Sequence, residues 1–197
     1  MENFELNIKA AGAYILYENY FVFMFGHGKN HSLNELGIVR FGGHLEKNET
    51  PIQCVLREVQ EEASLDLTFL DNRITYLNEN NISRKLIIHR QSPNPIFVIN
   101  NSDNEFSLMY LTYGKGTLIP KMETQGVIYL RKIDIEMICT KQTTLKEFKK
   151  NGGKFSLVKD LSEDSILIPH TQIIFLNDLF TLEKELMDKY MENKENN

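Results

Sequence analysis

Residues 42–65 read GGHLEKNETPIQCVLREVQEEASL, a stretch that begins with two glycines and contains five glutamates and one arginine. Three of its residues are of the types that begin a helix. Thr50 suits the N-cap, Pro51 suits the first helical position, and Gln53 completes a capping box. The stretch therefore predicts a helix from Pro51 to about Ala63.

The predicted helix has two distinct faces. The aliphatic residues that share one arc of about 100°, the face expected to pack on a core, are Ile52, Val55, Leu56, Val59 and Ala63. Glu58, Glu61 and Glu62 share a second arc, because spacings of three and four residues bring helical side chains together. Such like-charged pairs cost an isolated helix up to about 0.5 kcal/mol each. We interpret the carboxylates as a site for Mg²⁺ or Mn²⁺, which bind oxygen ligands and bridge phosphates.

Residues next to the carboxylates agree with this interpretation. Arg57 lies one turn before Glu61 and can also reach back to Glu49, which would hold the loop carboxylates in place. Gly42 and Gly43 allow the backbone to approach a ligand closely or to adopt positive φ.

These residues carry a family resemblance. Gly43, five residues, Glu49, seven residues and then REVQEEASL resembles the Nudix box, G-x5-E-x7-R-E-U-x-E-E-x-G-U, where U is aliphatic. Eight of its nine defined positions match over 23 residues. The exception is Ser64, where the family usually has glycine, and Phe41 stands where a proline often precedes the glycines.

The resemblance to the Nudix hydrolase family implies an α+β fold, the Nudix α/β/α sandwich with a mixed β-sheet. It implies metal-assisted attack of water on a diphosphate bond, in a nucleoside diphosphate linked to another moiety or in a nucleoside triphosphate. The cofactor would be Mg²⁺, with Mn²⁺ as the other option. The residues implied to bind it are Glu58, Glu61, Glu62 and Gly43, the last through its carbonyl.

The resemblance also implies catalytic roles. Glu58, Glu61 and Arg57 form the implied catalytic set, with Glu58 as the first candidate for the general base. The family does not always use the same residue as base, so the assignment among the glutamates stays open. Glu49 and Arg57 would support the geometry of the loop and helix.

Four residues outside this set are candidates for further parts of the site. Arg40 and His44 flank the glycines and are candidates for contacting substrate phosphate. Asp103 and Glu105 lie where some family members supply an extra carboxylate, although solvated loop acids explain them more simply.

The substrate is not identified by the sequence. Residues 81–83 contain neither the proline nor the tyrosine that marks some subfamilies, and no coenzyme A or NADH motif is found. This lowers the case for ADP-ribose, dinucleoside polyphosphates, coenzyme A and NADH, and leaves a nucleoside triphosphate open.

Composition limits the class of protein. The formal net charge of −5, with no basic block, argues against an extended nucleic-acid surface. The two cysteines, Cys54 and Cys139, provide no disulfide framework, and Cys54 is interpreted as an inert small residue. The N-terminus lacks the features of a signal peptide, and the most apolar stretch is interrupted by Glu18 and Asn19. We expect a cytoplasmic protein with no membrane span and a small nucleotide-type substrate. A homodimer is left open.

The remaining patterns predict strands and helices of a single domain over residues 1–197. Alternation over 12–25 predicts two strands joined by a tight turn at Glu18–Asn19. The segments predicted as loop, strand, helix or frayed end are a loop at 26–37, strands at 37–41, 65–70, 73–79, 106–114 and 126–132, helices at 143–153 and 171–190, and a frayed end at 192–197.

A second class of function competes with the hydrolase. A Nudix-fold module that only binds a nucleotide or a partner would be free to lose Glu58, Glu61 or Glu62. Because the chain keeps all three, the enzyme is favoured.

Overall fold

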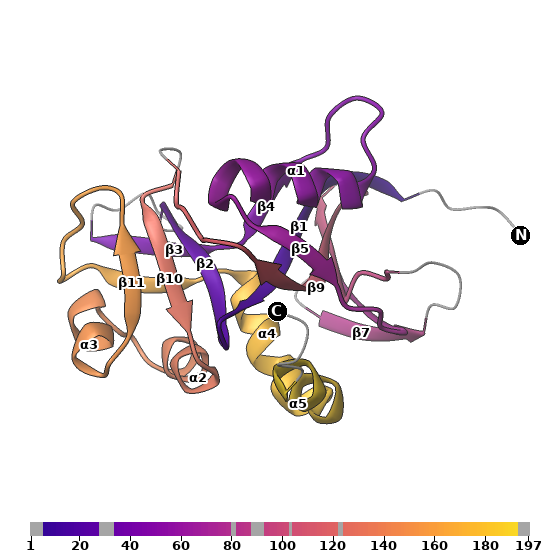
Figure 1. Ribbon diagram of the computed structural model, residues 1–197. Helices are drawn as coiled ribbons and strands as arrows, with labels where there is room; N and C mark the ends of the chain where they lie inside the picture. The colour runs from indigo at the N-terminus through magenta and orange to yellow at the C-terminus, as the bar shows by residue number, and fades with distance from the viewer. Residues whose placement is uncertain are drawn as a thin grey trace, which may run out of the picture. The chain divides into compact units, whose positions relative to one another are not determined.

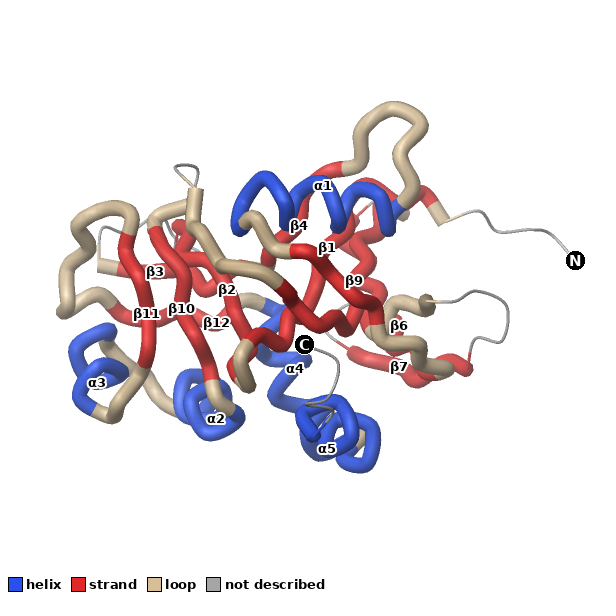
Figure 2. Tube along the Cα trace, viewed as in Figure 1, coloured by secondary structure: helices blue, strands red, loops and turns tan. Residues whose placement is uncertain are grey.

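The computed structural model describes residues 6–27, 34–79, 82–87, 93–102, 104–121 and 124–192. The chain divides into two compact units. The first unit is formed by Met1–Ile15 and Phe41–Gly116, and the second by Leu16–Arg40 and Thr117–Asn197. Figures 1 and 2 show the helices and strands of both units.

The first unit is a mixed β-sheet with one helix. The sheet order is β4-β1-β9-β8-β6-β7, and β5 pairs with β9. Strands β6 and β8 run parallel, whereas the β1–β4, β5–β9, β6–β7 and β8–β9 pairs are antiparallel. The bounds are β1 Asn7–Tyr17, β4 Phe41–His44, α1 Pro51–Ala63, β5 Asp66–Phe69, β6 Ile74–Glu79, β7 Ile82–Ile87, β8 Phe97–Ser102 and β9 Glu105–Lys115.

The strands of the second unit pair in the order β11-β10-β2-β3-β12, and β3 and β12 run parallel. Helix α4 contacts both α2 and α5. The Phe21 ring meets Phe180 and Tyr190 edge to face, which fixes α4 and α5 against β2. The bounds are β2 Tyr20–His27, β3 Glu35–Val39, β10 Gly126–Leu130, α2 Lys132–Thr140, α3 Leu145–Lys150, β11 Lys154–Leu157, β12 Ile166–Pro169, α4 Thr171–Leu182 and α5 Lys184–Glu192.

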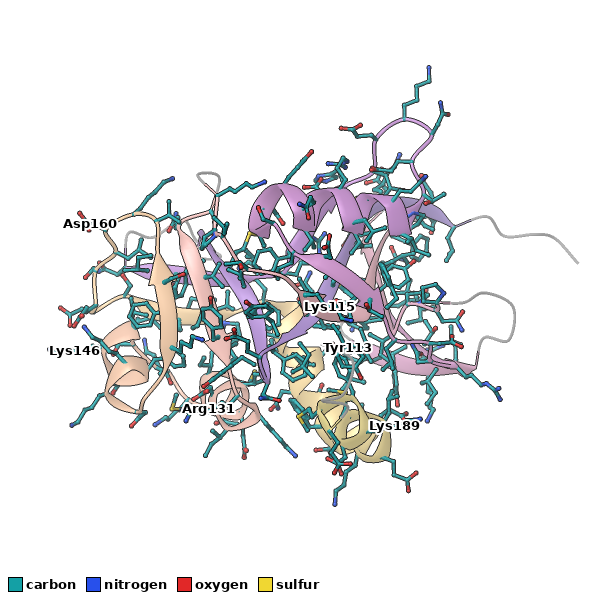
Figure 3. The ribbon with its side chains drawn as sticks, in the orientation of Figure 1. Tyr113, Lys115, Arg131, Lys146, Asp160 and Lys189 are labelled. Carbon is teal, nitrogen blue, oxygen red and sulfur yellow. The ribbon has the colours of Figure 1, made fainter. Side chains whose placement is uncertain are left out.

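Helix α1 begins and ends as predicted. The Thr50 hydroxyl accepts a hydrogen bond from the Gln53 N–H at 3.3 Å, and the Gln53 side chain accepts one from the Thr50 N–H at 2.9 Å. Both bonds of the capping box are therefore formed, with Pro51 in the first turn. The chain then enters β5, which places Asp66 opposite Lys115 of β9. Figure 3 labels Tyr113 and Lys115 of β9.

The prediction of which α1 residues pack on the core is partly wrong. Val55, Val59 and Ala63 are fully buried, but Leu56 is 40% exposed and Ile52 is only half-buried. The buried side of the helix is therefore turned away from Leu56 and toward Val55, because α1 packs on β4 and β5 along that edge of the aliphatic arc.

Several predictions for the other segments are confirmed. Strand β1 ends at Tyr17 and β2 begins at Tyr20, while Glu18 and Asn19 have φ of 49° and 69°, as a type I′ hairpin turn requires. The elements found close to their predicted positions are β5, β6, β9, β10 and α3.

Other predictions need correction. The strand expected at 37–41 is two strands, and the glycine pair lies inside β4. The helix expected at 171–190 is two helices that meet at Glu183. The loop expected at 26–37 is shorter, because residues 26–27 belong to β2 and residues 35–37 to β3, while residues 28–33 lie outside the described residues. Of the frayed end expected at 192–197, only Glu192 is described, and it ends α5. In the part of the chain that is described, every helix is too short or too polar to cross a membrane.

Ser64 follows α1 in the left-handed conformation, with φ 56° and ψ 32°, where the family usually has glycine. We expect Ser64→Gly to raise the free energy of unfolding by up to about 1 kcal/mol, because glycine adopts this conformation without strain. Ser64→Ala, which keeps the Cβ atom, is the matched control and should give no gain. Urea denaturation of the three proteins measures the difference, and a less stable glycine variant would contradict the expectation.

Candidate active site

Arg57 joins α1 to the loop that precedes it. Its Nε lies 2.8 Å from Oε1 of Glu49 and its Nη2 lies 3.0 Å from Oε2, a two-pronged ion pair. Nη2 also donates to the His44 carbonyl at 3.1 Å. The reach from Arg57 back to Glu49 that the sequence suggested is therefore present.

The remaining nitrogen of Arg57 contacts two glutamates of its own helix. Nη1 lies 2.9 Å from Oε1 of Glu58 and 3.4 Å from Oε2 of Glu61. Hydrogen bonding to Glu49, and then to Glu58, raises the pKa of Arg57, so the guanidinium stays charged. The positive charge of Arg57 thus offsets the repulsion among the carboxylates of Glu49, Glu58 and Glu61.

Glu58 and Glu62 both reach the glycine pair of β4. Oε2 of Glu62 accepts a hydrogen bond from the Gly42 N–H at 3.0 Å. The Glu58 carboxylate lies so close to Gly43 that a Cβ atom added there would overlap it. Gly42 has φ 126°, a conformation that side chains rarely adopt. A side chain at Gly43 would therefore displace the Glu58 carboxylate, and a side chain at Gly42 would strain the backbone.

Glu61 points elsewhere. Its side chain is 60% exposed, and Arg57 is the partner that it contacts. Across the described residues, no three His, Cys, Asp or Glu side chains are grouped as a metal site. The oxygens at the glycine pair nevertheless fit Mg²⁺ or Mn²⁺ chemically, since two carboxylates and backbone carbonyls are hard ligands.

Cys54 lies beside this site, and its role as an inert small residue, which the sequence suggested, stays a prediction. The thiol is fully buried, and its Sγ lies 3.5 Å from both the Gly43 and the His44 carbonyl oxygens. Burial, and then the charges of Glu49 and Glu58, raise the pKa of the Cys54 thiol. The residue type alone gave no signal of these contacts, which depend on how α1 packs on the end of β4.

The other candidates have less defined positions. His44 is exposed at the end of β4, and its carbonyl holds Arg57. Arg40 is half-buried and belongs to the second unit. Glu105 lies 3.8 Å from Lys9 in an exposed ion pair, and Asp103 lies outside the described residues.

The ion pair with Arg57 predicts a pH dependence of stability. Arg57 is the main cause that lowers the pKa of Glu49 from 4.5 to about 2, with a smaller contribution from the Glu46 N–H. Because the folded-state pKa is depressed, the pair stabilises the fold above about pH 4.5, and this contribution is lost as the pH falls toward about 2.

Glu49→Gln isolates this contribution. In EDTA, the wild type should be more stable than Glu49→Gln at neutral pH, and the gap should close as the pH falls from about 4.5 to about 2. Denaturation curves across this range measure the gap. A gap that stays constant down to pH 2 would show that the charge of Glu49 does not stabilise the fold.

Comparison of the chain with protein-family models finds a match. A family model described as the NUDIX domain matches residues 7–151, more than half of the chain. No curated protein matches the chain.

Three solved structures that resemble the chain carry related names. A NUDIX-family hydrolase from Clostridium perfringens is 18% identical with a TM-score of 0.47, and the match covers 67% of this chain and 85% of that one. An ADP-ribose pyrophosphatase from Streptococcus suis is 17% identical with a TM-score of 0.42, over 66% and 77% of the two chains. A C. elegans Ap4A hydrolase is 17% identical with a TM-score of 0.38, over 64% and 82%.

The family match covers the glycine pair, the whole of α1 and the strands of the first unit. The predicted fold class, an α+β Nudix-like α/β/α sandwich with a mixed β-sheet, is confirmed. The chain belongs to the Nudix family.

Proposed function

We propose that the chain is a Mg²⁺-dependent hydrolase, also active with Mn²⁺, that cleaves a diphosphate bond. Its substrate would be a nucleoside diphosphate linked to another moiety or a nucleoside triphosphate. The observation that carries this proposal is the convergence of Glu58 and Glu62 on Gly42 and Gly43. Two carboxylates held against a backbone without side chains bring together oxygen donors of the kind that a hard cation requires.

The residues that would hold the metal are Glu58, Glu61, Glu62 and the carbonyl of Gly43. When bound, the metal would neutralise phosphoryl charge and lower the pKa of its water. Glu58 is the proposed base, since its carboxylate lies against Gly43 and its Oε1 is fixed by Arg57 at 2.9 Å. The exposed Glu61 is free to turn toward the other ligands.

Arg57 would act by holding these groups in place. It keeps Glu49, the His44 carbonyl and Glu58 in one network, and this network joins the loop to the helix. Arg40 and His44 are proposed to contact substrate phosphate, and their roles depend on the substrate. We further propose that residues 1–197 work as one Nudix domain. A cytoplasmic location is proposed as well, because the two cysteines are free thiols.

A chromatographic screen for nucleoside mono- and diphosphate products tests the proposal, because cleavage of the diphosphate bond in a nucleoside diphosphate derivative yields two phosphomonoesters and no inorganic phosphate. The purified full chain is incubated with a panel of nucleoside triphosphates and nucleoside diphosphate derivatives, with Mg²⁺ or Mn²⁺ and with EDTA. We expect turnover of at least one class of compound, loss of that turnover in EDTA, and a rise at mildly alkaline pH. Undiminished activity in EDTA would exclude the metal. No turnover across the panel would favour a Nudix-fold module that binds a nucleotide or a partner without cleaving it.

A further inference from the structure

Cys54 is a residue of α1, and its thiol faces the end of β4, the strand whose glycines Glu58 and Glu62 reach. It follows the Thr50–Gln53 capping turn and precedes Arg57 by one helical turn. Its Sγ lies 3.5 Å from the Gly43 carbonyl oxygen, 3.5 Å from the His44 carbonyl oxygen and 3.9 Å from Nη2 of Arg57. The thiol therefore contacts three groups of the proposed site at once.

A thiol has one proton and is a weak hydrogen-bond donor. Two carbonyl oxygens at equal distance share that proton, and the His44 carbonyl also receives Nη2 of Arg57. These contacts fix the direction of two successive carbonyls at the end of β4. The next peptide groups lead into the loop that carries Glu49, so the turn out of the strand is held from the helix side.

We propose that Cys54 is a positioning residue that holds the Gly43 carbonyl where it can complete the metal site of Glu58 and Glu62. This inference rests on the proposed function, because it assigns the thiol a purpose only if a metal binds there. Groups that orient metal ligands through hydrogen bonds often matter nearly as much as the ligands themselves. Cys54 would do so through a backbone carbonyl.

The simpler alternative is that the Cys54 side chain only fills space between α1 and the end of β4. The two roles differ in what they require at this position. A space-filling role requires volume and tolerates the loss of a donor. A positioning role requires a donor and tolerates a change from sulfur to oxygen.

Cys54→Ala and Cys54→Ser separate these roles, because alanine removes the donor and serine keeps one. Cys139→Ala is the matched control, since Cys139 is the other cysteine, lies on α2 in the second unit and approaches the Ile173 carbonyl at 3.9 Å. The affinity for Mn²⁺ alone is measured by calorimetric titration of each folded protein. The kcat and KM are then measured at saturating Mg²⁺ on a substrate that the wild type cleaves.

We expect Cys54→Ala to weaken Mn²⁺ binding by about three- to tenfold, less than the larger losses typical of stronger outer-shell donors. Its kcat should fall by a similar factor while KM changes little. Cys54→Ser should stay within about twofold of the wild type, and Cys139→Ala should match it. Wild-type affinity in Cys54→Ala would overturn the proposal, as would equal losses in the alanine and serine variants.

A spectroscopic measurement covers the case in which Cys54→Ala does not fold. In the Cys139→Ala protein, the infrared S–H stretching band reports on Cys54 alone. We expect the band of a hydrogen-bonded thiol, which shifts when Mn²⁺ is added. A band that metal leaves unchanged would overturn the proposal. A wild type that neither binds Mn²⁺ nor turns over any substrate would instead refute the proposed function, on which this inference rests.

Discussion

Glu58→Gln is expected to lower turnover by at least about a hundredfold, the scale of a lost general base. Glutamine keeps the shape of the side chain, and its carbonyl oxygen can still accept the 2.9 Å hydrogen bond from Arg57. It cannot accept a proton, and it is a poorer ligand for a hard cation. The chemistry should therefore be lost while the fold remains.

The stability of Glu58→Gln should change by no more than about 1 kcal/mol, because Arg57 keeps its two-pronged pair with Glu49. The measurements are thermal unfolding in EDTA and turnover at saturating Mg²⁺. Glu136→Gln, at an exposed position of α2, removes the same charge and should leave both unchanged. If Glu58→Gln melted far below the wild type yet turned over normally, Glu58 would be a structural residue.

Gly43→Ala is expected to lower turnover by about ten- to a hundredfold, since a misplaced catalytic group commonly costs this much. The added Cβ atom would overlap the Glu58 carboxylate, which must swing away from the strand. The substitution should cause no backbone strain, because Gly43 is not among the glycines with positive φ. The displaced atoms belong to the end of a flexible side chain, so the free energy of unfolding should change by less than about 1 kcal/mol.

A double-mutant cycle tests whether Gly43→Ala acts through Glu58. In the Glu58→Gln background, the alanine should cost little further turnover, because the group that it displaces no longer works as a base. If the two losses simply multiplied, Gly43→Ala would act through some other group. If Gly43→Ala alone kept full turnover, the closeness of Gly43 and Glu58 would have no functional meaning.

The ends of α1 were predictable because their causes are local. The capping box needs only Thr50 and Gln53, and the left-handed residue after the helix is expected where the family pattern has glycine. The hairpin turn at Glu18–Asn19 was equally visible from its flanking strands. In each case, a few neighbouring residues determine the backbone.

The burial of α1 was less predictable, because it depends on partners distant in sequence. Helical spacing alone does not reveal how far the helix turns on β4 and β5, so the exposure of Leu56 was missed. The contacts of Cys54 were missed because helical spacing does not reveal which side of α1 faces the end of β4.

The spacing of Glu58, Glu61 and Glu62 predicts that they share one face of α1, which holds for Glu58 and Glu62 but not for Glu61. Glu58 and Glu62 are four residues apart and lie about 40° from each other around the helix, so both reach the glycine pair. Glu61 lies about 60° from Glu58 on the other side, where Arg57 and solvent are its surroundings. The sequence indicated one shared face, and the structure divides that face between two partners.

The central claim is that the carboxylates of α1 form the metal centre of a diphosphate hydrolase. The most direct test is a Mn²⁺ titration of the variant in which Glu58, Glu61 and Glu62 are all replaced by glutamine, alongside the wild type. We predict that the variant keeps its cooperative unfolding in EDTA but neither binds Mn²⁺ at the wild-type site nor turns over substrate. Mn²⁺ binding and turnover equal to those of the wild type would place the metal centre elsewhere and contradict the account.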